Sequence, residues 1–345
     1  MLTNATWIGF QHGINLGGWF SQCDYSEERY ETFIRKSDLQ TIAEWGLDHV
    51  RLPVDYNLVQ REDGSLIESG FRRIKTVIEW CREYGLHLVL DLHKTIGFSF
   101  DQGEAQTGFF ENKELQEHFY RLWEAFAVRL AGDSDMLAFE LLNEVTDRAY
   151  ADTWNQIVHQ CIQRIRKVAS EVPILVGGYW NNSIEAIPDL DAPYDEHIIY
   201  NFHCYDPLMF THQGAPWVNG MDTGFRYSIM QPVRELRHYT EEFRNAPAHD
   251  FDKVDPDKPL GADYFLHRFE QAVAVACQRH VKLYCGEYGV IDRASPEDAL
   301  RWYEAIHQAF ETYGIGRAAW SYREMDFGIS DSRMDSVRSR LIQLL

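Results

Sequence analysis

Eight short apolar runs, each followed by a segment with helical periodicity, predict an α/β protein whose strands close into a (β/α)8 TIM barrel. The runs are apolar on both faces, which is typical of parallel strands covered by helices. They begin near Gly13, His49, His87, Leu137, Ile174, Ile198, Leu283 and Arg317. Eight such units favour a closed barrel over an open sheet.

The segments between the runs carry helix signals of their own. Ser295 followed by Pro296 predicts the start of a helix, and Gly314 predicts its end. Ser37, with Gln40 three residues later, predicts another helix start through a capping box. The clearest apolar stripe at helical spacing is formed by Leu115, Phe119, Leu122, Phe126 and Leu130. We interpret these stripes as packing surfaces.

The longest interval between two runs predicts where the barrel is elaborated. It separates the sixth run, at Ile198, from the seventh, at Leu283. Insertions at strand ends build the active-site face of this fold. We therefore expect one catalytic domain over residues 1–345. A small helical insertion subdomain at residues 209–261, between strand six and helix six, is expected to line the cleft.

Composition excludes several classes of function. The chain has 345 residues, of which 45% are hydrophobic and 25% charged, as in a soluble globular protein. A net charge of −20 disfavours binding to nucleic acid or to an anionic membrane surface, because both are themselves negative. No stretch approaches the length of a membrane span. We expect neither nucleic acid nor membrane as a partner, and a monomer.

Cysteine usage bears on the compartment and on metal binding. The six cysteines include no CxxC pair and no Cys/His cluster at zinc spacing. Several lie in apolar periodic stretches, where a free thiol behaves as a small buried hydrophobe. The first eleven residues lack the features of a secretory signal. We therefore expect a reduced, cytoplasmic protein.

Two of the apolar runs end in a carboxylate. Leu141-Leu142-Asn143-Glu144 ends the fourth, and Tyr284-Cys285-Gly286-Glu287 ends the seventh. Burying a carboxylate is costly unless it is paired or used. In a (β/α)8 barrel, the reactive residues gather at the C-terminal ends of the strands. The sequence therefore predicts that Glu144 and Glu287 form a working pair at the mouth of the barrel.

Other strand ends contribute polar and aromatic side chains to the same face. The candidates are Asn15, Trp19, Arg51, His93, Asn143, His203, Tyr205 and Trp320. Strict alternation along a strand puts Asn143 and Glu144 on opposite faces. For both to reach the mouth, a bulge or the end of the strand must turn them.

This set of residues fits glycoside hydrolysis, which needs one carboxyl group to protonate the leaving oxygen and another to attack carbon or activate water. Arg51 beside one carboxylate would hold it ionised, and apolar surroundings would keep the other protonated. Asn143 is placed to hydrogen-bond a sugar hydroxyl, and Trp320 to carry the apolar face of a pyranose ring.

Other chemistries fit less well. The chain has no G-x-S-x-G, no P-loop lysine motif and no dinucleotide-binding fingerprint. Gly17-Gly18 and Gly177-Gly178 follow strands but lack the required spacing. A metal site built from His93, His203 and a carboxylate is geometrically conceivable, but no H-x-H or HExxH pattern supports it. We expect no metal and no other cofactor.

The chain resembles glycoside hydrolase family 5, a cellulase family built on a (β/α)8 barrel with acids on strands four and seven. The resemblance is carried, in order, by residues 13–19 (GINLGGW), 49–53 (HVRLP), 88–93 (LVLDLH), 139–144 (FELLNE), 200–203 (YNFH), 283–289 (LYCGEYG) and 319–320 (AW). These segments span nearly the whole chain.

The resemblance implies a retaining endo-β-1,4-glucanase that cleaves cellulose-like or mixed-linkage β-glucan, polysaccharide or oligosaccharide, by double displacement. It implies that Glu144 is the acid/base and Glu287 the nucleophile. Arg51, His93, Asn143, His203, Tyr205 and Trp320 would surround the sugar, and Trp217 would stand at the start of the insertion. A β-mannanase or glucomannanase, a β-1,3-glucanase and an inactive carbohydrate-binding barrel remain alternatives.

Two positions depart from the family pattern. Many members have a second histidine directly after the position of His93, where this chain has Lys94. Ser321 follows Trp320 where an asparagine is found in a similar protein. Both positions lie near the expected glycone side of the cleft, so we expect them to affect sugar preference more than mechanism.

Overall fold

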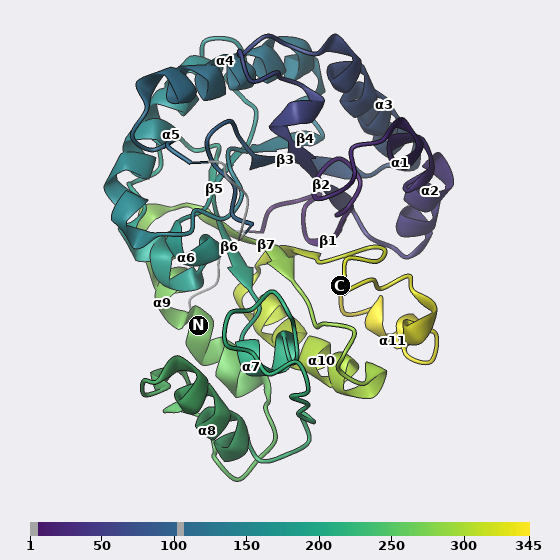
Figure 1. The fold of residues 1–345 in the computed structure, drawn as a ribbon, viewed down its shortest axis with the longest axis vertical. Helices are drawn as coiled ribbons and strands as arrows, with labels where there is room; N and C mark the ends of the chain where they lie inside the picture. The colour runs from purple at the N-terminus through teal and green to yellow at the C-terminus, as the bar shows by residue number, and fades with distance from the viewer. Residues whose placement is uncertain (1–5, 102–106) are drawn as a thin grey trace.

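A computed structural model describes residues 6–101 and 107–345, and its centre is a closed barrel of eight parallel strands (Figure 1). Each strand pairs with the next in the chain, and β8 pairs with β1. The strands are β1 His12–Asn15, β2 His49–Asp55, β3 His87–Lys94, β4 Leu137–Glu140, β5 Ile174–Val176, β6 Ile198–Cys204, β7 Lys282–Tyr288 and β8 Gly316–Ala319. The predicted fold class is confirmed.

Helices cover the outside of the barrel, most of them in a ring around it (Figure 1). They are α1 Glu27–Thr32, α2 Lys36–Glu44, α3 Glu68–Tyr84, α4 Lys113–Leu130, α5 Ala151–Ile165, α6 Tyr179–Asn182, α7 Leu208–Thr211, α8 Val233–Arg244, α9 Ala262–Arg279, α10 Pro296–Tyr313 and α11 Arg338–Leu341. None of the helices in the described ranges is long and apolar enough to cross a membrane.

The period-two alternation of the strands divides the protein into an outer and an inner core. On β3, Leu88, Leu90 and Leu92 pack in the large cluster between strands and helices. The alternate residue Val89 belongs instead to a small apolar cluster together with Trp7, Phe10, Ala138, Leu175, Ile199, Tyr284 and Ala318. These are inward-facing positions near the strand starts, so the interior of the barrel is apolar at its N-terminal end.

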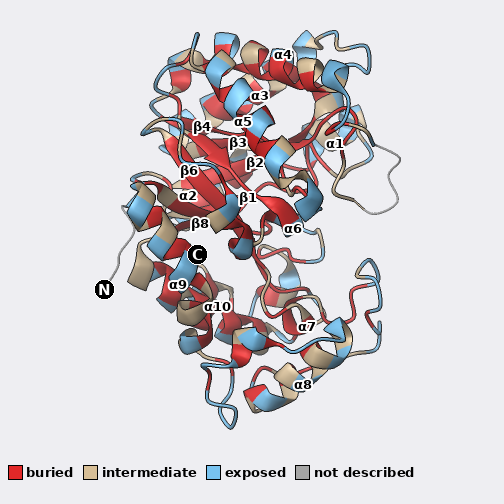
Figure 2. Ribbon diagram, turned by 90° about the vertical axis from the view of Figure 1, so that its left-hand side faces the viewer, coloured by how far each residue is buried: buried red, intermediate tan, exposed pale blue. Residues whose placement is uncertain are grey.

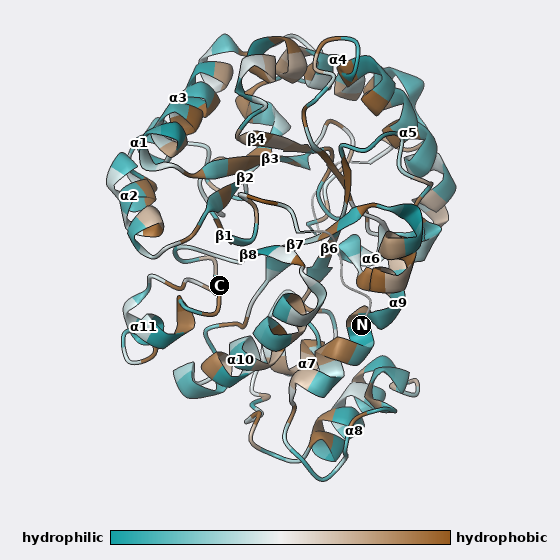
Figure 3. Ribbon diagram, turned by 180° about the vertical axis from the view of Figure 1, so that it is seen from behind, coloured by the Kyte–Doolittle hydropathy of each residue, from teal (hydrophilic) through white to brown (hydrophobic). Residues whose placement is uncertain are grey.

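The same alternation makes the interior polar one step further along the strands. In the strand register, Asn15 of β1 lies opposite Arg51 of β2, and Asp91 of β3 lies opposite Glu140 of β4. All four side chains are buried. Figure 2 shows the strands buried along their length, while the helices expose one side. Figure 3 shows the matching hydropathy pattern, with hydrophilic residues on the outer sides of the ring helices. The closed barrel, covered by its helices, thus buries a charged layer inside an otherwise apolar core.

Helix termini agree with one sequence signal and contradict another. Ser295 is the N-cap of α10 and its side chain accepts from the backbone N–H of Asp298, while Gly314 ends the helix with a φ of 67°. Ser37 is not an N-cap, because α2 begins earlier and its capping box joins Arg35 to Asp38. The side-chain carboxylate of Asp38 accepts from the backbone N–H of Arg35, which is the role that the sequence pattern assigned to Gln40.

Between β6 and α9 the chain forms the predicted helical insertion. It contains α7, α8 and a 3-10 turn at His249–Phe251. Figure 1 shows α8 outside the ring of barrel helices, below α9 and α10. The backbone of α8 is tied back by hydrogen bonds from Val233 N–H to the Lys258 carbonyl and from Arg234 N–H to the Pro256 carbonyl. The insertion therefore closes on itself before the chain re-enters the barrel at α9.

Removing the α10 cap tests this reading of the helix starts. Ser295→Ala should lower the free energy of unfolding by about 1 kcal/mol, because the Asp298 N–H loses its acceptor. Ser37→Ala is the matched control and should change it by less than about 0.3 kcal/mol. Urea denaturation followed by circular dichroism measures both. Equal losses from the two variants would contradict the assignment.

Candidate active site

The centre of the site is the guanidinium of Arg51 on β2, which is fully buried inside the barrel. Its Nε and Nη2 donate to the two carboxylate oxygens of Glu140 at 2.7 and 2.8 Å. Its Nη1 donates to Glu287 Oε1 at 2.6 Å, and Nη2 also lies 3.0 Å from Asp91. Three carboxylates from three other strands thus share one cation, and they raise the pKa of Arg51 well above its usual range.

Two asparagines complete the surroundings of Arg51. Asn15 accepts from Arg51 Nη1 at 2.9 Å and donates to the carbonyl of Gly286, directly before Glu287. Asn143 accepts from Arg51 Nη2 at 2.9 Å. The Nδ2 of Asn143 is buried and has no hydrogen-bond partner within the described part of the chain. The Asn15 amide therefore holds the strand that carries Glu287, and the Asn143 amide has an N–H donor that a bound group could use.

Glu287 at the end of β7 is held on both oxygens. Arg51 donates to Oε1, and the hydroxyl of Tyr205 donates to Oε2 at 2.9 Å. Register pairs Glu287 with His203 on β6, where the ladder shifts by one residue. A charged donor on one oxygen and a hydroxyl donor on the other therefore fix the position of this carboxyl group.

Glu144 lies in the loop that follows β4, not on the strand itself. The strand ends at Glu140, whereas the sequence reading carried it to Glu144. Asn143 still donates its backbone N–H to the Leu92 carbonyl of β3, but Glu144 has a φ of 43°. This left-handed residue breaks the alternation, so the conflict between Asn143 and Glu144 is resolved by a turn at the strand end.

The surroundings of Glu144 differ from those of Glu287. Its oxygens contact His203 Nδ1 at 2.8 Å and Asn181 Nδ2 at 2.9 Å, and no salt bridge to Arg or Lys reaches it among the described residues. Burial raises the pKa of Glu144 to about 7, although the Asn181 hydrogen bond works in the opposite direction. Glu287 is thus paired with a cation, whereas burial favours the protonated form of Glu144.

The two histidines of the site are buried and neutral. Burial lowers the pKa of His93 and of His203 to about 4. His93 Nδ1 lies 2.6 Å from Asp91 Oδ2, so that carboxyl group orients its ring. Burial also raises the pKa of Asp91 to about 7. His203 bridges the acids, with its Nδ1 3.7 Å from Glu287 Oε2.

Aromatic side chains form one wall of the site. Trp320 at the end of β8 lies parallel to the ring of His93, with centroids 5.8 Å apart. A Cβ at Gly17 would lie 2.7 Å from the Trp320 ring, so a glycine is required where β1 ends. Tyr205 contacts His212 edge-on, and His212 in turn contacts Trp217, which is 43% exposed. Trp217 therefore lies at the rim, two ring contacts from Tyr205.

The structure corrects the placement of Trp19. This side chain is 2% exposed and stacks on Phe20 and Trp80, and its Nε1 donates to the Tyr30 carbonyl. It belongs to the core between the β1–α1 loop and α3, and not to the mouth of the barrel. A tryptophan four residues beyond Asn15 has left the strand, so the strand-end rule no longer fixes its direction.

The two residues that depart from the family pattern both have partners inside the protein. Lys94, the last residue of β3, is 4% exposed and its Nζ lies 2.7 Å from Asp101. Ser321 is fully buried, and its hydroxyl donates to the Asn15 carbonyl at 3.3 Å. Lys94 thus adds a cation directly after His93, while Ser321 secures the backbone beside Trp320.

Sequence reasoning missed four residues of this group. They are Asp91, Glu140, Asn181 and Asn201, the last of which donates to Glu140 at 2.8 Å. A signal was present for the first two, because each is an acid inside an apolar run. For Asn201 the signal was its alternation with His203. Nothing in the sequence pointed to Asn181.

The candidate acids and His203 converge closely. An oxygen of Glu144, an oxygen of Glu287 and a ring nitrogen of His203 all lie within 4.8 Å of one another. Across the described ranges this is also the one cluster with the convergence that a metal site needs. Its atoms are engaged by hydrogen bonds from Arg51, Tyr205 and Asn181, so interactions within the protein account for the geometry.

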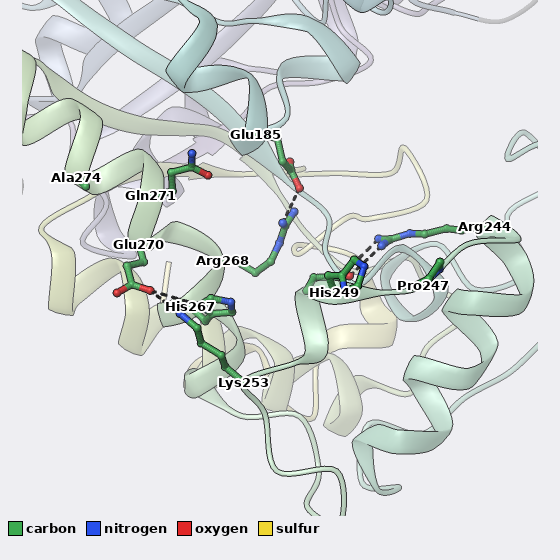
Figure 4. Close-up of a pocket in the computed structure, with 11 residues that line it drawn as sticks. Glu185, Arg244, Pro247, His249, Lys253, His267, Arg268, Glu270, Gln271 and Ala274 are labelled. Carbon is green, nitrogen blue, oxygen red and sulfur yellow. Dashed lines mark hydrogen bonds and ion pairs between the residues drawn. The ribbon is translucent and has the colours of Figure 1, made fainter.

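A separate cavity of about 640 Å³ lies between α9 and the loop that follows α8 (Figure 4). Its charges are largely matched in pairs, with Arg268 on Glu185, Arg244 on Asp250 and Lys253 on Glu270. None of the residues that line it belongs to the Arg51 cluster. It is therefore distinct from the site of the two acids.

Comparison with known families decides the classification. Residues 6–326 match the model of the cellulase family, glycosyl hydrolase family 5. The chain belongs to glycoside hydrolase family 5. It is therefore a glycoside hydrolase. Of its two candidate acids, Glu287 lies on β7 and Glu144 lies in the loop after β4.

Curated relatives within this family are similar over most of their length. Cellodextrinase A of Ruminococcus flavefaciens is 50% identical over 309 residues, covering 90% of this chain and 84% of the relative. Endoglucanase C of Acetivibrio thermocellus is 36% identical over 342 residues, or 98% of both chains. The solved structure of Cel5A of Thermotoga maritima in complex with cellobiose has a TM-score of 0.76 at 22% identity, covering 97% of both chains, which shows a common fold.

The role of Arg51 in this family 5 hydrolase is testable through stability. Arg51→Met should lower the free energy of unfolding by about 3 to 5 kcal/mol at pH 7, because buried carboxylates lose their cation. The deficit should shrink at pH 5, where the acids are protonated in the folded variant. Arg340→Met, which breaks an exposed ion pair with Glu297, is the control and should cost less than about 1 kcal/mol. Urea denaturation at both pH values measures these differences, and a pH-independent deficit would contradict the assignment.

Proposed function

We propose that this protein is a retaining endo-β-1,4-glucanase that hydrolyses cellulose-like or mixed-linkage β-glucan and its oligosaccharides. The observation that carries the proposal is the unequal environment of Glu144 and Glu287. Glu287 accepts from Arg51 and Tyr205, whereas the pKa of Glu144 is raised to about 7 by burial. One ionised and one protonated carboxyl group are what glycosidic cleavage needs.

In the first step, Glu287 acts as the nucleophile. A carboxylate oxygen attacks the anomeric carbon as the glycosidic C–O bond breaks, and the bonding electrons pass to the leaving oxygen. Glu144 gives its proton to that oxygen. Arg51 orients Glu287 through Oε1, and Tyr205 supports Oε2.

In the second step, the now ionised Glu144 takes a proton from water. The water oxygen attacks the anomeric carbon, and the bond to Glu287 breaks with its electrons returning to the carboxylate. Carboxyl groups about 5 to 5.5 Å apart suit this double displacement, whereas inversion needs about 6.5 to 9.5 Å. Oxygens of Glu144 and Glu287 within 4.8 Å of each other support retention.

Two further features suit a sugar as the bound group. The free Nδ2 of Asn143 is buried next to the acids, where a sugar hydroxyl would satisfy it. Trp320, braced by the parallel ring of His93, offers a flat surface for a pyranose ring. The printed names of relatives, cellodextrinase A and endoglucanase C, support β-1,4-linked glucose as the sugar.

The experiment is product analysis on carboxymethylcellulose, lichenan, cello-oligosaccharides and mannan, with proton NMR of the anomeric signals in the first minutes. We expect cleavage of the glucans with the β-anomer appearing first. Glu287→Gln should lower kcat by about 10⁴-fold or more while the melting temperature stays close to that of the wild type. Early release of the α-anomer would refute retention, and faster cleavage of mannan than of every glucan would refute the assigned sugar.

The pH dependence of the reaction follows from Glu144. The raised pKa means that this group is protonated below about pH 7 and ionised above it. The kcat/KM for a cello-oligosaccharide should therefore fall as the pH rises through about 7, since the proton donor is lost. Initial rates between pH 4 and pH 9 measure the profile. A basic limb below pH 5 would be inconsistent with the assignment of Glu144 as the acid.

A further inference from the structure

The turn that follows β5 has an unusual backbone. Trp180, Asn181 and Asn182 have φ angles of 51°, 57° and 54°, so three consecutive residues with side chains occupy the left-handed region. Asparagine tolerates this region better than most residues do. Gly177 makes the turn possible, because a Cβ at this position would lie 2.3 Å from the Asn182 side chain. The Gly177-Gly178 pair, which matches no nucleotide-binding motif, thus belongs to this turn.

The turn is fastened to the loop that carries Glu144. The backbone N–H of Asn181 donates to the carbonyl of Val145 at 3.0 Å. The side-chain Nδ2 of the same residue donates to Glu144 Oε2 at 2.9 Å. Since Val145 directly follows Glu144, one residue clamps both the backbone and the carboxyl group of the proposed acid.

The other oxygen of Glu144 has a different kind of partner. His203 Nδ1 lies 2.8 Å from Oε1, and this ring is neutral because burial lowers the pKa of His203 to about 4. The His203 side chain is 1% exposed, whereas Asn181 is exposed at the surface of the site. Asn181 is therefore the partner of Glu144 that can be altered without opening the core.

We propose that Asn181 is a positioning residue for the proton transfers of Glu144. It aims the carboxyl group at the leaving oxygen, and its hydrogen bond strengthens as Glu144 becomes ionised during proton donation. The inference rests on the proposed function, because it needs Glu144 to be the acid. Because the Asn181 N–H already points at the carboxyl group, it does not have to move when negative charge develops on Glu144.

Other charged and titratable groups also face Glu144 and remain in place when Asn181 is changed. They are Arg51 on β2, Asp91 and His93 on β3, Asp101 in the loop after β3, His203 on β6, Tyr205 beyond β6, and Glu287 on β7. Because these groups are common to both proteins, a difference between wild type and an Asn181 variant reports on the one hydrogen bond.

Asn181→Gly is the appropriate variant. Glycine adopts positive φ freely, so the side chain is removed without distorting the turn. Asn245→Gly is the matched control: Asn245 is also an exposed asparagine with a φ of 50°, but it ends α8 far from the acids in sequence and contacts neither. Any general effect of the substitution on folding should be shared by both variants.

Two measurements on these proteins test the proposal. The first is carbon-13 NMR titration of the Glu144 carboxyl group, assigned with Glu144→Gln. We expect the Glu144 pKa to rise by about 0.5 to 1 unit in Asn181→Gly and to stay unchanged in Asn245→Gly, because the ionised form loses a donor. The second compares kcat/KM on phenyl and 2,4-dinitrophenyl β-cellobioside, whose leaving groups need protonation to different degrees.

For Asn181→Gly we expect about a tenfold loss of kcat/KM on the phenyl substrate and less than a twofold loss on the dinitrophenyl substrate. An unchanged Glu144 titration, or equal losses on the two substrates, would overturn the proposal. If the wild type cleaves neither cellobioside, the proposed function fails instead, and the titration alone then decides whether Asn181 controls Glu144.

Discussion

The structure depends on one buried cation. Arg51 has no exposed surface, and it is balanced by Asp91, Glu140 and Glu287 from three separate strands. A guanidinium inside a protein is tolerated only when carboxylates surround it with good hydrogen-bond geometry. These partners meet only after β2, β3, β4 and β7 have taken their places in the closed barrel. The charge distribution of the site therefore forms only in the closed barrel, and it stabilises that barrel in return.

This constraint also separates the surroundings of the two acids, Glu144 and Glu287. Arg51 makes its nearest contacts to Glu140 and Glu287, and both face the barrel interior. Glu144 does not contact Arg51, because it lies beyond the end of β4 and its left-handed backbone turns it away from the strand. Its partners there are a neutral histidine and an amide. The different surroundings of the two acids thus follow from where each strand ends.

The sequence was sufficient for features that depend on local periodicity. Apolar runs located all eight strands, and strand-end reasoning found Arg51, His93 and His203 as well as the two acids. The sequence was not sufficient where the direction of a side chain, or a contact between segments distant in the chain, determines the site. Trp19 lies beyond the end of β1, so the alternation of the strand does not determine where its side chain points. The contact between Asn181 and Glu144 forms only because a left-handed turn after β5 meets the loop after β4. Glu140 and Asp91 were within reach, because an acid in an apolar run requires a cation, and Arg51 was already identified.

The polar residues of the candidate site lie in an inner and an outer layer. The Arg51 cluster is the inner layer, and its cation and three carboxylates are paired with one another inside the barrel. Lys94 and Asp101 lie beyond it at the end of β3, and Trp217 lies at the rim on the inserted segment. Asp101 also faces Glu144 and helps to raise its pKa, so the outer layer is coupled electrostatically to this acid. The Lys94 side chain pairs with the same Asp101, so this departure from the family pattern sets the charge of the outer layer while the Arg51 cluster keeps its own partners.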